Sequence, residues 1–366
     1  MTVHEDFLSW AKNKGVKYTG IRPRSRETII SVPVKALHTL ETVKEEIAEK
    51  LITDDVSVQG ILAADMMVGS AANLATWIAV LPARVDLEVG MPILWPQELQ
   101  ELLPKTAKTI LRKQQTKFRR DADKVLAAFS HFNNCIMAGE HNYLSKWLLI
   151  GTRTFYYITP SRENLSFDDC LALTPLADLF NHANSGCQVS FSSKSYKVTA
   201  NRAYHTSEEI YVCYGNHSND FLIEYGFVLA ENRWDEICLD EVIIPALSEQ
   251  QKAELKTTGY LGNYMLDAET AGCFRTQVAL RLMVSSRDEW QSFLNSGDGI
   301  ASQAKVDILL AQLIDIFLRR IQEKLQRINN LHHIGQERQR RLLARRWEQI
   351  KTLFKKSAKS LRCYST

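Results

Sequence analysis

The sequence predicts an α+β protein in which small β-sheets are interrupted by a large helical insertion and followed by an all-α region. Three observations predict this class. Apolar residues recur at helical spacing over about residues 40–147, short alternating segments follow up to about residue 213, and helical patterns dominate after residue 245. We therefore expect residues 1–245 to form the α+β domain, with its insertion at about 40–147, and residues 246–366 to form the helical domain.

Length and composition limit the class of protein. The chain has 366 residues, of which 45% are hydrophobic and 24% charged, which is enough for two globular domains and excludes wholesale disorder. The seven cysteines include no Cys-x-x-Cys pair, which argues against a structural zinc site. The charged N-terminus does not resemble a signal peptide, and no apolar stretch reaches the roughly 18 residues of a membrane span. We expect a cytosolic or nuclear protein with no membrane partner.

The first predicted elements are a short helix and a strand. Residues 7–14 have the pattern of a helix that ends at Gly15, and residues 28–34 have the β-branched composition of a strand that runs into a bend. In the helical block that follows, apolar spacing predicts the buried faces, and four prolines mark the boundaries between helices: Pro82, Pro92, Pro96 and Pro104.

The middle of the chain has β-type patterns. Residues 147–157 lead into a proline loop, and residues 187–191, 196–200 and 209–213 alternate as short strands do. The β-branched run at 242–244 also predicts a strand.

Two long helices are predicted near the C-terminus, at residues 308–330 and 336–359. They are joined by a turn that contains Gly335, so we expect an antiparallel pair. The net charge of +3 is small, but residues 319–362 contain fourteen Lys or Arg and three Glu. This bias fits either a solvated basic face or a surface for an acidic partner.

A first motif, TPLADLFNHANSG at residues 174–186, carries polar residues in an apolar surrounding. Its centre consists of Asp178, Asn181 and His182, which the flanking apolar residues would bury. Taken alone, such a loop is more often a satisfied hydrogen-bond network than a ligand site.

A second motif, EEIYVCYGNHSNDFLIEYGFVLAENRWDE, occupies residues 208–236. It places Tyr214 just after a predicted strand, and Tyr225 and Phe227 in a Tyr-Gly-Phe run. Each of these aromatic residues taken singly would be explained as part of a core. The joint occurrence of the two motifs at this spacing is far rarer than either alone and favours a functional site.

Together the motifs resemble the SET-domain protein methyltransferases, in the branch typified by the Rubisco large-subunit methyltransferase. In that branch a helical insertion splits the SET β-fold, and a helical substrate-binding domain follows. Four further segments carry the resemblance: LATWIAVLP (74–82), MPILWPQELQELLP (91–104), GTRTFYY (151–157) and GNYMLDAETAGCFRTQVALR (262–281). The resemblance implies a SET fold, S-adenosylmethionine as cofactor, no metal, and transfer of a methyl group to a protein lysine.

The resemblance also implies roles for cofactor-binding residues. Asn181 and His182 would hold the adenine end of the cofactor, and Asp178 would support their loop. Arg153, with Thr152, would contact the methionine carboxylate, a task that suits a guanidinium because it can bind bidentately.

Three aromatic residues would act at the reacting groups. Tyr225 and Phe227 would line the channel for cofactor and lysine, and Tyr214 would lie at the methyl-transfer centre. The transfer needs the amine nitrogen, the methyl carbon and the sulfonium sulfur in line, so its catalysis is mainly positioning and electrostatics. A desolvated aromatic channel beside the sulfonium charge would lower the pKa of the incoming lysine and so keep it neutral.

One element departs from the pattern of the branch. A Gly-x-Gly cofactor loop is expected between the opening helix and the strand TIISVP (28–33), but only IRPRSRE (21–27) separates GVKYTG (15–20) from that strand. We expect this segment to be too short for the loop and its β-hairpin. Loss of several main-chain hydrogen bonds to the cofactor would weaken binding by roughly two or more orders of magnitude. A skipped coding segment, a degenerate paralogue, or replacement of the loop by residues 22–26 would each explain it.

Three functions are compatible with these observations. The first is a protein-lysine N-methyltransferase, with a ribosomal protein or another abundant protein as a candidate substrate. The second is a protein-histidine methyltransferase with the same fold. The third is a catalytically impaired, SET-derived interaction protein whose basic C-terminal helices bind an acidic or ribosomal partner. We expect a monomer and no direct contact with nucleic acid.

Overall fold

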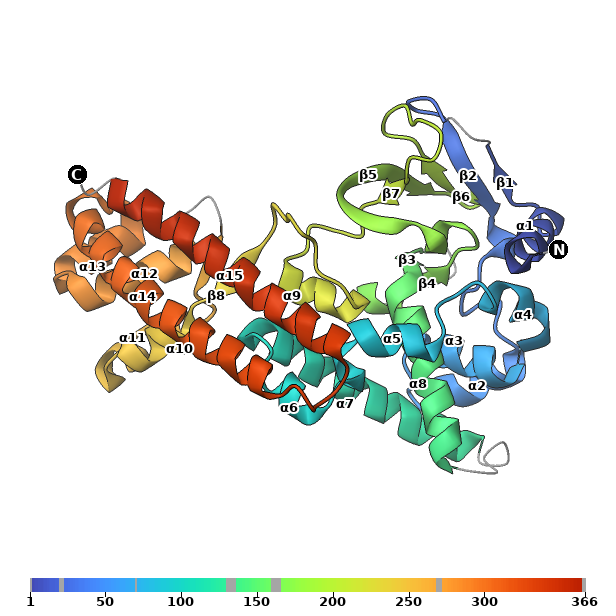
Figure 1. Ribbon diagram of the computed structural model, residues 1–366, viewed down its shortest axis with the longest axis horizontal. Helices are drawn as coiled ribbons and strands as arrows, with labels where there is room; N and C mark the ends of the chain where they lie inside the picture. The colour runs from blue at the N-terminus through green and yellow to red at the C-terminus, as the bar shows by residue number, and fades with distance from the viewer. Residues whose placement is uncertain are drawn as a thin grey trace. The chain divides into compact units, whose positions relative to one another are not determined.

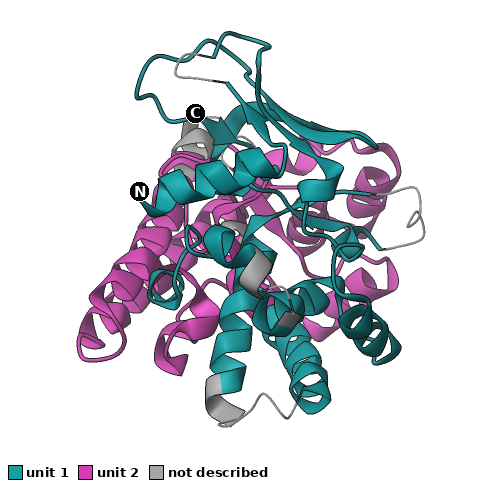
Figure 2. Ribbon diagram, turned by 90° about the vertical axis from the view of Figure 1, so that its right-hand side faces the viewer, with its two compact units in different colours: residues 1–88, 112–216 teal, residues 89–111, 217–366 magenta. Residues whose placement is uncertain are grey.

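The structure is a computed structural model that describes residues 2–19, 23–69, 71–129, 136–158, 166–267 and 272–363. Within these ranges, small β-sheets are combined with many helices, which confirms the predicted α+β class (Figure 1). The chain divides into two compact units. Unit 1 comprises residues 1–88 and 112–216, and unit 2 comprises residues 89–111 and 217–366 (Figure 2). The domain limits predicted at residues 245 and 246 stay a prediction.

Unit 1 contains the main sheet, whose described strands lie in the order β1-β2-β6-β5-β7. Neighbouring strands are antiparallel, except that β5 and β7 are parallel. In β6, Tyr196 and Val198 are buried while Lys197 is exposed, as the predicted alternation requires. The strands are β1 (Lys17–Tyr18), β2 (Thr28–Pro33), β5 (Asn181–Phe191), β6 (Ser195–Thr199) and β7 (Tyr211–Val212).

The first two strands form a short hairpin, which corrects one prediction. Lys17 pairs with Ser31 in antiparallel register, so the expectation that this segment is too short for a β-hairpin was wrong. A two-residue strand suffices because the returning chain makes a compact turn, in which the Glu27 N–H donates to the Arg24 carbonyl at 3.0 Å. The Gly-x-Gly loop was expected between Gly20 and Thr28, and residues 20–22 of this stretch lie outside the described residues.

The predicted helical block is present and is divided between the two units, because residues 89–111 belong to unit 2. One boundary differs, because the helix α8 continues past Trp147 to Arg153, where β3 (Thr154–Tyr156) begins and pairs with β4 (Leu171–Leu173). The apolar run at 147–150 is buried inside this helix, and periodicity alone does not distinguish such a run from a strand. The helices that lie wholly or partly in unit 1 are α1 (Val3–Asn13), α2 (Glu45–Thr53), α3 (Val58–Ala64), α4 (Ala71–Ile78), α5 (Arg84–Gly90), α7 (Lys105–Ala128) and α8 (Ile136–Arg153).

A buried carboxylate joins three of these helices. Asp121 on α7 has no exposed surface, and its Oδ2 accepts a hydrogen bond from the Trp147 indole N–H at 3.0 Å. It also accepts hydrogen bonds from the main-chain N–H and the hydroxyl of Ser57. Ser57 in turn caps the N-terminus of α3. One side chain of α7 therefore holds the start of α3 and the middle of α8.

Unit 2 is built mainly from helices around one apolar core, which includes Ile243, Leu280, Val306, Ile314 and Trp347. Its short strands β8 (Glu236–Cys238) and β9 (Met265–Asp267) pair antiparallel. The helices are α6 (Gln97–Gln100), α9 (Asn219–Leu222), α10 (Asp240–Ala246), α11 (Glu249–Thr257), α12 (Phe274–Val284), α13 (Arg287–Ser296), α14 (Ile300–Asn330) and α15 (Glu337–Cys363).

The predicted antiparallel pair of long helices is confirmed. The helices α14 and α15 pack along one another and are joined by a tight turn in which Gly335 has a φ of +64° (Figure 1). The predicted strand at 242–244 was wrong, because these residues lie in α10. Asp240 and Glu241 occupy the first turn of α10, where carboxylates are favourable, and the buried face of the helix takes Val242 and Ile243.

None of the helices in the described ranges has both the length and the hydropathy of a membrane span.

The role of Asp121 predicts a large loss of stability on substitution. Asp121→Ala leaves the buried N–H of Trp147 and the buried groups of Ser57 without an acceptor, so we expect the free energy of unfolding to fall by about 3 kcal/mol. Asp123→Ala, at an exposed position of the same helix, should change it by less than about 0.5 kcal/mol. Urea unfolding followed by circular dichroism measures both. Equal effects of the two substitutions would contradict this role.

Candidate functional site

The two sequence motifs meet in unit 1, where β5 and β7 pair in parallel at His182 and Val212. Tyr214 follows β7, and its main-chain N–H donates to Nδ1 of His182 at 3.0 Å. Its hydroxyl donates to the Phe180 carbonyl at 2.6 Å, and the His182 and Tyr214 rings lie 5.1 Å apart. The tyrosine is therefore held at both ends by residues that begin or precede β5.

This pairing depends on a glycine in the first motif. Val212 pairs with both His182 and Cys187, so β5 bulges between these two residues. A Cβ atom on Gly186 would lie 2.6 Å from the Tyr211 carbonyl oxygen, closer than real Cβ contacts allow. The strands can approach one another here only because residue 186 has no side chain.

The hydrogen bonds define protonation states at His182 and Tyr214. Because Nδ1 of His182 accepts a hydrogen bond, this nitrogen carries no proton, and the buried ring is neutral with its proton on Nε2. Burial raises the pKa of Tyr214 above its ordinary value, while the charge of Arg153 lowers it and that of Asp178 raises it. The phenol is therefore protonated at neutral pH, as its donation to Phe180 requires.

Arg153 and Asp178 lie together in the same unit. Asp178 is 3% exposed on the turn Ala177–Leu179, and its Oδ2 accepts from the Trp77 indole N–H at 2.8 Å. The Arg153 guanidinium donates from Nη1 to the Asp178 main-chain carbonyl at 2.6 Å. Among the described residues, Oδ1 of Asp178 has no hydrogen-bond partner.

Asp178 changes its protonation state near neutral pH. Burial raises its pKa to about 7, against the lowering effects of the Trp77 hydrogen bond and the Arg153 charge. Because one carboxylate oxygen is buried without a donor, the neutral form is favoured far more than in water.

The predicted residues Thr152 and Asn181 are held differently. The Thr152 hydroxyl donates to the Leu148 carbonyl at 2.8 Å within its own helix. Asn181 is exposed, and its amide donates to Oε1 of Glu209 at 2.6 Å. Glu209 also accepts from the Tyr211 hydroxyl, and these two hydrogen bonds lower its pKa.

Unit 2 contains the other two predicted site residues, Tyr225 and Phe227. Both are half-buried, their ring centroids lie 6.4 Å apart, and the ring of His217 lies 6.2 Å from that of Tyr225. Gly226 between them has a φ of +86°, which favours glycine. A Cβ atom on Gly90 would lie 2.1 Å from the Gly226 carbonyl oxygen, so the two glycine backbones are in direct contact.

Two further predictions concern the arginines at residues 22–26 and a possible metal site. Of the arginines suggested as a substitute for the missing loop, Arg24 and Arg26 are exposed, and Arg22 lies outside the described residues. Among the described residues, no group of three His, Cys, Asp or Glu side chains could hold a metal ion.

Sequence reasoning assigned no role to Trp77, Phe180 or Glu209, although each contacts a predicted site residue. Trp77 lies in the quoted segment LATWIAVLP, which was a usable signal. The role of Phe180 is carried by its main-chain carbonyl, which residue identity does not reveal. The functions assigned to the predicted site residues stay predictions.

The chain has similarities to known proteins along most of its length. The family model of the ribosomal lysine N-methyltransferase 2 C-terminal domain matches residues 235–360. A protein of Schizosaccharomyces pombe named ribosomal lysine N-methyltransferase set11 is 33% identical over 39% of this chain and 36% of its own length. Human SET domain-containing protein 4 is 24% identical over 93% of this chain and 83% of its own length. A Drosophila melanogaster actin-histidine N-methyltransferase is 25% identical over 64% of this chain and 50% of its own length. The match to the fission-yeast protein thus spans about a third of that protein.

Solved structures show the same fold. The structure titled Rubisco LSMT bound to AdoMet superposes with a TM-score of 0.65 at 14% identity, and covers 100% of this chain and 92% of that one. A related structure, of the LSMT SET domain bound to lysine and AdoHcy, gives the same score at 13% identity.

The chain therefore has the fold of the solved Rubisco LSMT structures. In sequence it is similar to SET-domain and ribosomal lysine N-methyltransferase proteins, so the resemblance inferred from the sequence is confirmed.

The raised pKa of Asp178 predicts a pH-dependent stability. Its folded pKa of about 7 lies above the ordinary value of 3.8. The stability that this carboxyl contributes is therefore fully present below about pH 4 and is lost as the pH rises to about 7.

Asp178→Asn keeps an acceptor for Trp77 and removes the titration. We expect the stability of this variant, relative to the unsubstituted protein, to rise by up to about 4 kcal/mol between pH 4 and pH 8. Urea unfolding at several pH values measures the difference. Asp168→Asn, at an exposed position of unit 1, should show no such trend. A pH-independent difference for Asp178→Asn would show that the carboxyl does not titrate in this window.

Proposed function

We propose that the protein is an S-adenosylmethionine-dependent protein-lysine N-methyltransferase. The observation that carries the proposal is the placement of Tyr214, which is held by His182 and Phe180 at the point where the two motifs meet. The names of the relatives and the ligands of the solved neighbours support it. We further propose a ribosomal protein as the substrate and the cytosol or nucleus as the compartment.

The residues of unit 1 fit the proposed cofactor. A guanidinium has five N–H donors. Arg153 donates from Nη1 to the Asp178 carbonyl, so its other donors can bind the methionine carboxylate. Asn181 and His182, at the start of β5, would hold the adenine end. Oδ1 of Asp178, which has no partner within the described ranges, is a buried acceptor that a donor of the ligand can satisfy. When bound, the cofactor supplies an electrophilic methyl group on a sulfonium sulfur.

Tyr214 would act by position and by charge distribution. Its phenol oxygen lies 2.6 Å from the Phe180 carbonyl oxygen, so two partly negative oxygens are held side by side. Such oxygens can accept weak C–H···O contacts and stabilise positive charge near them. The lysine amine must be neutral to attack the methyl carbon, and one of its protons then leaves to solvent. By the resemblance, Tyr225 and Phe227 line the path of this lysine.

Two alternatives have observations in their favour. The match to the Drosophila actin-histidine N-methyltransferase favours a histidine acceptor. The sequence departure at residues 21–27, together with the basic bias of residues 319–362, favours a catalytically impaired interaction protein.

The role of Tyr214 predicts a defect in transfer. Tyr214→Phe removes the hydroxyl and leaves the ring, so we expect the rate of methyl transfer to fall about 100-fold or more. Incubation of a ribosomal protein fraction with labelled cofactor, followed by mass spectrometry, measures the rate and identifies lysine or histidine as the acceptor. Tyr156→Phe, at an exposed residue of the same unit, is the control. Undiminished transfer by Tyr214→Phe would refute the assignment.

Cofactor binding separates the enzyme from the impaired protein. We expect calorimetry to give a Kd in the micromolar range, and Arg153→Met to weaken binding by about tenfold or more because it removes a charge-assisted contact. Arg84→Met, at a half-buried arginine of unit 1 that pairs with Glu88, is the matched control. If the unsubstituted protein shows no measurable binding, the enzyme proposal fails and the interaction protein is favoured.

A further inference from the structure

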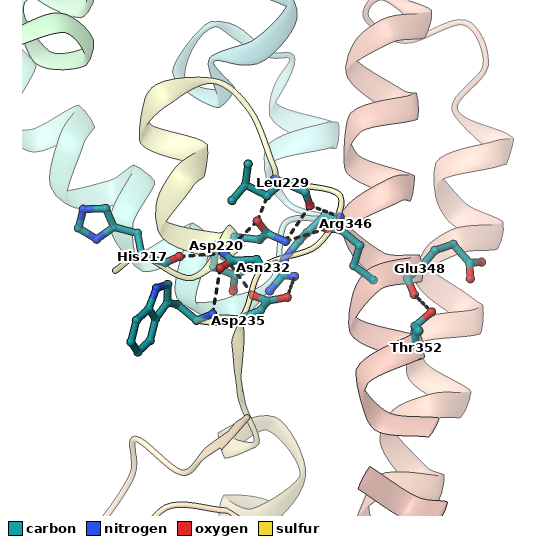
Figure 3. Close-up of polar contacts among 11 residues, drawn as sticks. His217, Asp220, Leu229, Asn232, Asp235, Arg346, Glu348 and Thr352 are labelled. Carbon is teal, nitrogen blue, oxygen red and sulfur yellow. Dashed lines mark hydrogen bonds and ion pairs between the residues drawn. The ribbon is translucent and has the colours of Figure 1, made fainter. Parts of the chain in front are cut away.

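A buried ionic cluster lies in unit 2, centred on Arg346 of α15. Its Nε donates to Oδ1 of Asp220 at 2.7 Å, and its Nη1 donates to Oδ2 of Asp235 at 2.6 Å (Figure 3). All three side chains are buried, and burial raises the pKa of Asp220 even though Arg346 opposes the shift. Among the described residues, Nη2 of Arg346 has no partner.

Such a cluster is not an efficient way to gain stability. Two carboxylates share one guanidinium, and Nη2 of Arg346 has no partner in the described part of the chain, so the desolvation cost is only partly offset. Apolar side chains of similar volume often stabilise a core equally well or better. What the ionic cluster supplies is geometry, because charged hydrogen bonds hold only when the donors and acceptors are correctly placed.

The cluster fixes the two ends of one chain segment, residues 219–235. The main-chain N–H of Asn219 donates to Oδ1 of Asp235 at 3.1 Å, which closes the segment into a loop. Inside the loop, Oδ1 of Asn219 accepts from the Leu229 N–H at 3.0 Å and from the Asn232 amide at 3.2 Å (Figure 3). Tyr225 and Phe227 lie within this segment.

A second residue of α15 reaches the same loop. The Gln349 side chain donates to the Leu229 carbonyl at 2.6 Å and accepts from the Asn219 amide at 3.2 Å. Both main-chain groups of Leu229 are therefore held, the N–H by Asn219 and the carbonyl by Gln349 and by the Asn219 side-chain amide. On the other side of Phe227, Gly226 lies against the backbone of Gly90. Phe227 is thus placed between two fixed points of the backbone.

We propose that α15 positions the aromatic pair Tyr225 and Phe227 through Arg346 and Gln349, and that Arg346 and Gln349 are thereby positioning residues for methyl transfer. The second part rests on the proposed function, in which the pair lines the path of the acceptor side chain. The first part is a statement about the loop and can be tested without any activity.

The variants must remove the positioning contacts without leaving buried charges unpaired. Arg346→Met alone would strand two carboxylates, so it is combined with Asp220→Asn and Asp235→Asn, which keep an acceptor oxygen at each position. Gln349→Leu removes only the contacts to the loop. Glu348→Leu, at the neighbouring exposed position, introduces the same side chain and is the matched control (Figure 3).

The first measurement is native-state hydrogen exchange, observed at the main-chain N–H groups of Leu229 and Asn219. We expect Gln349→Leu and the triple variant to accelerate exchange at these amides about tenfold or more, with no change at β6 in unit 1. Glu348→Leu should leave both amides as they are. Unchanged exchange in Gln349→Leu and in the triple variant would overturn the proposal that α15 holds the loop.

The second measurement is steady-state kinetics on the variants that retain the circular dichroism spectrum and cooperative melting. We expect kcat to fall about tenfold in Gln349→Leu with no change in Glu348→Leu. Faster exchange with an unchanged kcat would overturn the role in transfer. If the unsubstituted protein transfers no methyl group, the proposed function has failed, while the exchange data still decide whether α15 positions the loop.

Discussion

The parallel contact between β5 and β7 is the interaction on which the candidate site depends. It brings Tyr214 to His182 although the two are far apart in the sequence, and it gives the tyrosine its second anchor at Phe180. The contact requires a bulge in β5 and a residue without a side chain at position 186. The local geometry of one glycine therefore determines whether two polar motifs become a single site.

Three buried carboxylates of the chain, those of Asp121, Asp178 and Asp220, differ in how many of their oxygens have partners. We relate this difference to the role of each carboxylate. Asp121 accepts from Ser57 and Trp147 and holds three helices together. Asp178 has one oxygen paired with Trp77 and one without a partner among the described residues, which fits the ligand-binding role that we propose for it. Asp220 shares a single guanidinium with a second carboxylate, an arrangement that serves geometry more than stability.

The sequence predicted the parts of the structure that depend on local pattern or on family motifs. It predicted the strands at residues 187–191 and 196–200, which overlap β5 and β6, and the long helices α14 and α15. It also singled out the two motifs that contain His182 and Tyr214. It did not predict that residues 242–244 are helical, because a short β-branched run fits a buried helix and a strand equally well. It also did not identify Asp178 as the hydrogen-bond partner of Trp77, because the two residues are 101 positions apart. Periodicity carries no information on such tertiary partners.

The link between α15 and the loop at 219–235 limits which segments can be exchanged between this protein and its relatives. The family model that covers residues 235–360 includes Arg346 and Asp235 but stops short of Asp220. A chimera that exchanged only that region between relatives would separate a buried cation from one of its two counter-ions. The C-terminal helices are therefore not an interchangeable module, and the three charged positions must be transferred together.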